Sequence, residues 1–251
     1  MASTSMATLI RIPDIDVVIL CGGQGTRLAS VIGDTPKSIA LIGGRPFLDI
    51  LIDQAAGWGC RRFILCAGYQ RDAIHDHFRD FDAGLEVLIA DEDAPLGTGG
   101  ALRDARPLIR SNPVLVMNGD SICPLDMRGL VAQHADRRAD LTIAITRMQE
   151  TGDYGTVSIG EHDRVRSFRE KVPCADAWAS AGIYLVDAAL FGRMPAGDHF
   201  SLEHDLFPSL VDLKCYGYAT DAPLIDIGTP ERYQDAQTTI PALGIPPRKR
   251  V

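Results

Sequence analysis

Short apolar runs alternate with amphipathic segments through the first half of the chain. Four runs rich in branched apolar residues predict buried strands, at 16–21, 62–67, 85–90 and 114–117. Apolar residues that recur at helical spacing predict helices between them, at 47–55, 70–78 and 100–108. Gly57 and Gly59 are expected to end the first of these helices. This βαβαβαβ order predicts an α/β fold with a mostly parallel sheet and helices on both faces.

The pattern changes after residue 140, where strands follow one another with little helix between them. Strands are predicted at 141–147, 156–159, 165–168, 181–186, 214–219 and 224–227. Turn-forming residues at 160–163 predict a hairpin, and further helices are predicted at 202–210 and 230–240. The second half therefore predicts a smaller, β-rich lobe.

No linker separates the two halves, so we expect a single domain over 14–243. Its first lobe spans about 14–140 and its β-rich lobe about 141–243. Ser, Thr and Ala dominate residues 1–13, which predicts a disordered leader. Residues 244–251 are predicted to form a frayed basic tail.

Composition and charge exclude several classes of protein. Apolar residues make up 46% of the 251 residues, which is enough for a large core. Acidic residues outnumber basic ones by 33 to 25, and the net charge of -8 disfavours nucleic acids and anionic membranes as partners. No apolar stretch reaches the ~20 residues of a membrane span and no secretory signal is apparent, so we expect a cytoplasmic protein. The six cysteines form no CxxC pair and are predicted to be reduced thiols.

A glycine-rich loop, Gly22–Leu28, follows the first predicted strand. It matches the dinucleotide-binding pattern GxGxxG only in part, because Leu28 stands at the third glycine position. It also lacks the Gly-Lys-Ser/Thr end of a Walker A loop, and a plain glycine-rich turn is the alternative. Arg27 in the loop and Lys37 after it place two cations near the carboxyl end of a strand. Backbone N–H groups and cations in such a place suit a polyphosphate.

The loop and the residues after it resemble the hallmark of the sugar-1-phosphate nucleotidyltransferases. Gly-Gly-Gln-Gly-Thr-Arg-Leu occupies 22–28, and Pro36-Lys37 follows. The proline that usually comes soon after the leucine is missing from residues 29–32. The resemblance extends over roughly residues 15–240. It implies a Rossmann-like mixed, mostly parallel central sheet of the nucleotide-diphospho-sugar transferase type, with a nucleotide-binding first lobe and a sugar-binding second lobe.

Further segments match this family in chain order. Residues 95–100 resemble its base-binding loop, and Asn118-Gly119-Asp120 resembles the strand end whose aspartate binds Mg²⁺. Glu170-Lys171 resembles the pair that holds the sugar and its phosphate. Residues 226–230 resemble the segment that supplies the second metal-binding carboxylate. The joint occurrence of these segments makes the resemblance specific.

The resemblance implies a role for each matching position. Nucleotide contacts are implied for Leu20, Gly22, Gly23, Gly25, Thr26, Pro95, Gly97 and Thr98. Contacts to the sugar phosphate are implied for Asn118, Tyr154, Gly155, Glu170, Lys171, Gly182 and Tyr184. Catalytic roles are implied for Arg27, Lys37, Asp120 and Asp226. Asp120 and Asp226 are also expected to bind the Mg²⁺ cofactor, which prefers oxygen ligands.

These segments also have plainer interpretations. Asn-Gly-Asp is a common turn, Glu170-Lys171 reads as a solvated ion pair, and Asp226 could cap the helix predicted from Pro230. Asp91-Glu92-Asp93 fits the DxD pattern of glycosyltransferases that use nucleotide sugars. This pattern precedes the base-binding loop rather than lying at a metal site, which favours the nucleotidyltransferase.

The implied reaction joins a nucleoside triphosphate and a sugar 1-phosphate to give an NDP-sugar and pyrophosphate. The attacking phosphate has a second pKa of ~6, so it needs no general base at neutral pH. Because two anions must meet, Arg27 is expected to neutralise the pyrophosphate, Lys37 the reacting phosphates and Lys171 the sugar phosphate. Glu170 and Tyr154 are expected at the sugar hydroxyls.

The choice of base and sugar rests on resemblance alone. The Pro-Leu-Gly-Thr base loop, and segments 37–47 and 200–203, resemble bacterial D-glycero-α-D-manno-heptose 1-phosphate guanylyltransferases. GTP and this heptose phosphate or a deoxy derivative are the expected substrates, for surface polysaccharide synthesis. A mannose-1-phosphate guanylyltransferase, a hexose-1-phosphate cytidylyl- or uridylyltransferase and a non-catalytic nucleotide-sugar sensor are the alternatives, although a sensor need not keep the full charge set. Family analogy predicts a homodimer.

Overall fold

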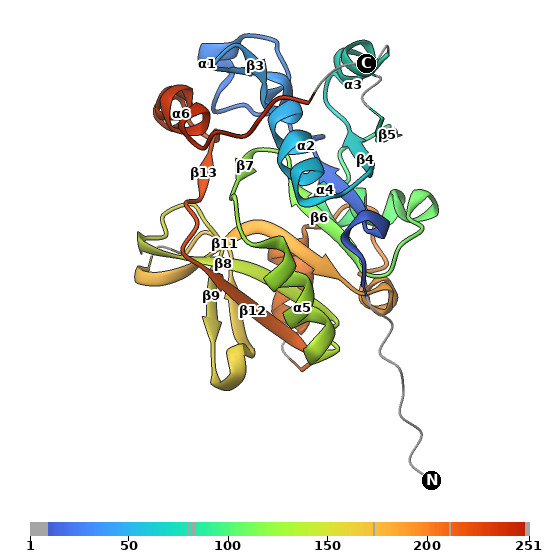
Figure 1. The fold of residues 1–251 in the computed structure, drawn as a ribbon, viewed down its shortest axis with the longest axis vertical. Coiled ribbons are helices and arrows are strands. Elements are labelled where there is room, and N and C mark those ends of the chain that lie inside the picture. Colours follow the sequence, from blue (N-terminus) through green and yellow to red (C-terminus); the bar gives the residue numbers. More distant parts are fainter. Residues whose placement is uncertain (1–9, 80, 82–83, 173, 211, 249–251) are drawn as a thin grey trace.

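A nine-stranded sheet runs through the computed structural model, which describes residues 10–79, 81, 84–172, 174–210 and 212–248 (Figure 1). Its strand order is β10-β9-β11-β6-β1-β4-β5, and β8 and β12 extend it from β11. The strands are β1 (Asp16–Leu20), β4 (Arg62–Ala67), β5 (Glu86–Asp91), β6 (Val114–Asn118), β8 (Leu141–Glu150), β9 (Thr156–Ile159), β10 (Val165–Arg169), β11 (Ala175–Val186) and β12 (Cys215–Thr220).

Two short ribbons and several helices surround this sheet. The ribbons pair β2 (Leu41–Ile42) with β3 (Arg45–Pro46), and β7 (Ser121–Ile122) with β13 (Ile225–Asp226). The helices are α1 (Ala29–Ile32), α2 (Phe47–Trp58), α3 (Arg71–Phe78), α4 (Gly97–Asp104), α5 (Met127–Arg137) and α6 (Pro230–Ala242).

The parallel half of the sheet is the one that the sequence predicts. β6, β1, β4 and β5 are neighbours and run parallel. Their carboxyl ends therefore meet along one edge, which is where ligands bind in sheets of this kind. β11 pairs antiparallel with β6, so the sheet is mixed. The predicted fold class is confirmed.

Successive side chains of β1 point to opposite faces of the sheet, and helices cover both faces. Val17 and Ile19 pack into one apolar cluster with α2, α3 and α5. Val18 packs into the other cluster with α4 and with residues 202–210. All three side chains are fully buried. Burial on both faces is the reason that this strand reads as a continuous apolar run.

The β-rich lobe is built around β11. β9 and β10 form the predicted hairpin, and β8 lies between β11 and β12. β11 begins at Ala175 rather than at the predicted Ala181, because its first residues are exposed, include Asp176 and gain their pairing from β8. A register shift between Ser180 and Tyr184 marks a bulge, in which Gly182 has a φ of +69°. This bulge faces the first lobe, since a Cβ at Gly182 would lie 2.8 Å from the Ser121 Oγ.

Several helical segments differ from the sequence prediction. α5 is not predicted, because polar residues interrupt its buried positions, which are Met127, Leu130, Val131 and His134. α2 continues through Gly57 and ends only at Gly59, which is left-handed with a φ of +114°. Residues 202–210 form a π-helical turn, Leu202–Leu206, followed by a 3-10 turn rather than one helix.

Both predicted end segments are partly folded. Ile10 and Ile12 pack against the core, so the leader prediction is wrong for residues 10–13, and residues 1–9 lie outside the described residues. Arg248 pairs with Asp49 and Asp53 at 3.1 and 2.9 Å, and only 12% of its side chain is exposed. The frayed-tail prediction is therefore wrong as far as residue 248, and 249–251 lie outside the described residues.

The cysteines agree with the prediction of reduced thiols. All six are free, and all but Cys174 are buried. Within the described ranges, no helix combines the length and the apolar character that crossing a membrane requires.

Candidate active site

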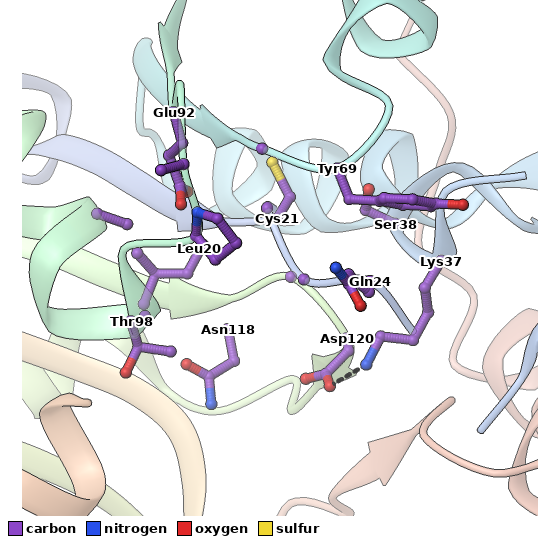
Figure 2. Close-up of a pocket in the computed structure, with 18 of the residues that line it drawn as sticks. Leu20, Cys21, Gln24, Lys37, Ser38, Tyr69, Glu92, Thr98, Asn118 and Asp120 are labelled. Atoms are coloured by element: carbon purple, nitrogen blue, oxygen red, sulfur yellow. Dashed lines mark hydrogen bonds and ion pairs between the residues drawn. The ribbon is translucent and has the colours of Figure 1, made fainter. Parts of the chain in front are cut away.

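Two cavities meet at the carboxyl edge of the parallel strands. The larger, of about 510 Å³, lies between the glycine-rich loop, the start of α4 and the end of β6 (Figure 2). The smaller, of about 280 Å³, is lined by residues of both lobes. Thr98, Asn118 and Asp120 line both cavities. A molecule in one cavity therefore lies next to a molecule in the other.

The glycine-rich loop lies against Lys37. Gly25 has a φ of +60°, and a Cβ there would be 2.9 Å from the Lys37 Cβ. The Lys37 Nζ donates to the Asp120 Oδ2 at 2.6 Å, and Figure 2 shows this pair at the rim of the larger cavity. Only 17% of the Lys37 side chain is exposed. The loop thus holds a cation beside the end of β6.

The predicted base-binding loop forms the first turn of α4, which begins at Gly97 rather than at the predicted Gly100. Gly97 has a φ of +70°, and a Cβ there would lie 2.6 Å from the Phe200 carbonyl oxygen. The Gly99 N–H donates to the same oxygen at 2.9 Å. Because these glycines lack side chains, the Phe200 backbone can approach the loop closely and hydrogen-bond to it.

Glu92 is a carboxylate in the larger cavity that sequence reasoning did not assign (Figure 2). Its Oε2 accepts a long hydrogen bond from the Leu96 N–H at 3.4 Å. Burial raises the pKa of Glu92, and the nearby charge of Asp104 adds to this effect. Its position three residues before Pro95, the first residue of the base loop, was the available signal.

The glycosyltransferase interpretation of residues 91–93 is not supported. Asp91 pairs with His75 at 2.8 Å, and Asp93 pairs with Arg71 at 2.8 Å. In the part of the chain that the structure describes, no group of three His, Cys, Asp or Glu residues could hold a metal ion. Asp91 and Asp93 are thus each engaged by a side chain of α3 rather than by one another.

Asp120 and Asp226 come together through the β7–β13 ribbon. In this ribbon Asp226 lies opposite Ser121, the residue after Asp120. The Ile227 N–H donates to the Asp120 carbonyl at 3.0 Å. Both carboxylates line the smaller cavity. They supply only oxygen ligands, which fits Mg²⁺ provided that water and phosphate oxygens complete its coordination.

Asp226 is held firmly by its neighbours. Its Oδ1 accepts from the Gly228 N–H at 2.8 Å and faces the Arg232 Nη1 at 3.4 Å, and its Oδ2 accepts from the Tyr154 hydroxyl. Burial, followed by this bond to Asp226, raises the pKa of Tyr154. Thr229 rather than Asp226 caps α6, so the plainer interpretation of Asp226 as a helix cap is wrong.

Several residues of the β-rich lobe line the smaller cavity. Glu170 is largely buried and Lys171 is 61% exposed, with 3.9 Å between the Lys171 Nζ and the Glu170 Oε1. Burial and then the charge of Glu203 raise the pKa of Glu170. The half-exposed Arg27 pairs with Asp153 at 2.7 Å at the mouth of this cavity.

Most of the predicted residues line one of the two cavities. Those at the larger cavity are Leu20, Gly22, Gly23, Lys37, Pro95, Gly97, Thr98, Asn118 and Asp120. Those added by the smaller cavity are Arg27, Tyr154, Gly155, Glu170, Lys171, Gly182, Tyr184 and Asp226. Gly25 and Thr26 line neither. Lining residues absent from the prediction include Glu92, Asp153, Ser180, Ser201, Glu203 and Arg232.

The fold and this site define a class of protein. Residues 16–242 match the model of the nucleotidyl transferase family, and the chain belongs to that family.

Two curated relatives and one solved structure are similar to this chain along most of its length. The chain is 35% identical over 224 residues to the D-glycero-alpha-D-manno-heptose 1-phosphate guanylyltransferase of Aneurinibacillus thermoaerophilus, covering 89% of this chain and 97% of the relative. It is also 35% identical to the mannose-1-phosphate guanylyltransferase of Mycobacterium tuberculosis, but covers only 62% of that longer protein. The structure of HddC from Yersinia pseudotuberculosis complexed with GMP-PN matches with a TM-score of 0.80 and 35% identity, covering 90% of this chain and 99% of HddC.

Proposed function

We propose that this protein is a guanylyltransferase that converts GTP and D-glycero-α-D-manno-heptose 1-phosphate, or a deoxy derivative, into GDP-heptose and pyrophosphate. Family membership supports the class of reaction. The relatives that match along nearly their whole length carry the name of this activity. On resemblance alone, the proposal extends to a cytoplasmic homodimer that serves surface polysaccharide synthesis.

Glu92 is the observation that carries the choice of guanine. It lines the cavity next to the base loop, and its carboxylate can only accept hydrogen bonds when ionised. Guanine presents two adjacent donors, N1–H and N2–H, on one edge, and a carboxylate matches both. Adenine presents an acceptor at N1, which the carboxylate would repel. The structure of HddC with GMP-PN adds a relative that binds a guanine nucleotide.

The triphosphate is proposed to lie along the glycine-rich loop towards Arg27 and Lys37. In such a position the loop N–H groups and Arg27 would neutralise the departing pyrophosphate, and Lys37 would neutralise the reacting phosphates. Gly22, Gly23 and Lys37 line the larger cavity, which is consistent with this path. Asp120 stands where the two cavities meet, so the α-phosphorus is proposed to lie beside it.

Asp120 and Asp226 are proposed to hold Mg²⁺, which would supply further positive charge to the phosphates. Lys37 is paired with Asp120, and Arg232 lies beside Asp226. These cations offset part of the electrostatic repulsion between the two carboxylates. The chain's own contribution is thus positioning and charge neutralisation rather than proton transfer.

The sugar phosphate is proposed to occupy the smaller cavity. Tyr154 and Glu170 would contact sugar hydroxyls, and the exposed Lys171 would contact the phosphate. A cavity of about 280 Å³ lined by several hydroxyl and carboxylate groups suits a polar ligand of this kind. The resemblance to the heptose relatives, at 35% and 34% identity, is the support for heptose as the sugar.

A substrate matrix tests this function. Pyrophosphate release would be measured with Mg²⁺ for GTP, ATP, CTP, UTP and dTTP against the 1-phosphates of the heptose, mannose and glucose. GTP with heptose 1-phosphate is expected to give the highest kcat/KM. Highest activity with mannose 1-phosphate would contradict the sugar, and highest activity with CTP or UTP would contradict the base. Nucleotide binding without turnover of any pair would indicate the sensor.

A further inference from the structure

Glu203 is a buried carboxylate that the implied site residues do not include. The residue is 8% exposed and lines the smaller cavity. Its Oε2 accepts hydrogen bonds from the hydroxyl groups of Thr98 at 2.6 Å and Ser201 at 3.0 Å. Its Oε1 accepts one from the Tyr184 hydroxyl at 3.2 Å. Within the described residues, hydroxyl groups rather than an ion pair hold this charge.

One end of this network lies on the base loop. Thr98 lines both cavities, and its Oγ1 also accepts a hydrogen bond from the Leu202 N–H at 2.8 Å. The Phe200 N–H donates to the Leu96 carbonyl at 3.0 Å, while its carbonyl accepts from the Gly99 N–H. The base loop and residues 200–203 are therefore joined on both sides of Thr98 and are expected to move as one unit.

The other end of the network lies in the sugar lobe. Tyr184 is a fully buried residue of β11, and its hydroxyl lies 3.3 Å from the Ser180 Oγ. Ser180 and Tyr184 both line the smaller cavity, on either side of the Gly182 bulge. Glu170 lies close enough for the charge of Glu203 to raise its pKa. One carboxylate thus contacts both the base loop and the wall of the sugar cavity.

We propose that Glu203 is a positioning residue that couples the two substrate sites. A base that fixes Thr98 would fix the Glu203 carboxylate, and through it the Tyr184 hydroxyl at the sugar cavity. The two substrates would then bind with positive cooperativity, and linkage requires each to raise the affinity for the other by the same factor. This inference rests on the proposed function, because it assigns the two cavities to a guanine nucleotide and a sugar 1-phosphate.

A linkage experiment tests the coupling. Calorimetry would measure the Kd of guanosine 5′-(α,β-methylene)triphosphate with Mg²⁺, with and without saturating heptose 1-phosphate. The wild type is expected to bind the nucleotide at least about fivefold more tightly when the sugar phosphate is present. In Glu203→Gln this factor is expected to fall below about twofold, because an amide NH₂ cannot accept from Thr98 or Tyr184.

Two further variants separate coupling from folding. Thr98→Val keeps the shape of the side chain but removes the hydroxyl. The double variant, which combines Thr98→Val with Glu203→Gln, is expected to lose no more coupling than either single variant. Asp205→Asn is the matched control, since its carboxylate lies on the same turn and accepts from the Ser201 N–H. It is expected to keep the wild-type coupling factor. The Tm of each variant would report its folding.

The outcomes distinguish this inference from the proposed function. No turnover of GTP with heptose 1-phosphate by the wild type would contradict the proposed function. If the wild type turns over these substrates but shows no coupling, the proposed role of Glu203 is contradicted and the proposed function is not. The same holds if Glu203→Gln keeps the wild-type coupling factor. Equal loss of coupling in Asp205→Asn would also overturn it, since it would show that any change on this turn has the same effect.

Discussion

At the scale of single residues, three cations of the site are each paired with an acidic side chain. Lys37 binds Asp120, Arg27 binds Asp153, and Arg232 lies between Asp153 and Asp226. Each carboxylate orients a cation towards one of the two cavities. Such pre-positioned charge is the main requirement for joining two phosphorylated substrates. Glu92 stands apart from these pairs and lines the larger cavity.

Glu92→Gln is expected to weaken the selection of guanine. The amide would place a donor against one guanine donor, so kcat/KM for GTP should fall about 10–100-fold. Asp91→Asn is the matched control, because Asp91 is the preceding residue and pairs with His75 outside the cavity. Pyrophosphate release by both variants with GTP and heptose 1-phosphate would measure the effect. An equal loss in the two variants would contradict the assignment of Glu92.

Most of the charged residues that line the two cavities could be singled out from sequence, whereas Glu92 and Glu203 could not. Arg27, Lys37, Asp120 and Asp226 lie in segments whose spacing and order resemble a family. Glu92 lies within an acidic triplet that suggested a different chemistry. Glu203 is 105 residues from Thr98, so its contact exists only because residues 200–203 fold against the base loop. Such contacts leave no local pattern.

At the scale of elements, the accuracy of the sequence prediction depended on how completely each element is buried. β4 was predicted at its observed bounds because all six of its residues are buried and apolar runs mark such strands. α5 was missed because it carries a buried polar residue, His134, on its apolar face. Half of β11 was missed because its amino-terminal half is partly exposed and takes its conformation from β8.

His134 is expected to make stability depend on pH. Burial lowers its pKa from 6.5 to about 4, against the weaker opposing charges of Asp187 and Asp140. Between these pH values the unfolded chain binds more protons than the folded one, so the free energy of unfolding falls as the pH falls. The contribution is complete above about pH 6.5 and decreases by about 3 kcal/mol by pH 4.

Urea unfolding of the wild type and His134→Gln between pH 7 and pH 4 would measure this effect. The other titrating groups are common to both proteins, so the difference between the two curves isolates His134. The variant is expected to lose less stability over this range. His162→Gln, which changes an exposed histidine, serves as the control and should follow the wild type. Parallel curves for the wild type and His134→Gln would contradict the account.

At the scale of the whole molecule, the chain returns to its first lobe through α6, where the Tyr233 hydroxyl and the Gln237 amide donate to the Leu41 carbonyl. The segment after α6 crosses towards α2 (Figure 1), where Arg248 pairs with Asp49 and Asp53. Arg45 also pairs with Asp53, and the Arg248 guanidinium lies over the Phe81 ring at 4.4 Å. Residues far apart in sequence thus hold the α2 face of the sheet together.

Arg248→Ala is expected to lower the free energy of unfolding by about 3 kcal/mol, because it removes a partner from two buried carboxylates. Arg11→Ala removes an exposed partner of Asp14 and is expected to have little effect. Urea unfolding at pH 7 would compare the two variants. Equal stabilities would show that the Arg248 contacts do not stabilise the fold.

The sugar phosphate is proposed to attack the α-phosphorus of GTP. The fate of radioactive label in a single reaction of GTP, heptose 1-phosphate and Mg²⁺ tests it most directly. Label from [α-³²P]GTP is predicted to appear in the GDP-sugar, and label from [γ-³²P]GTP to leave entirely as pyrophosphate. Transfer of the γ label to the sugar, or its release as inorganic phosphate, would contradict the account.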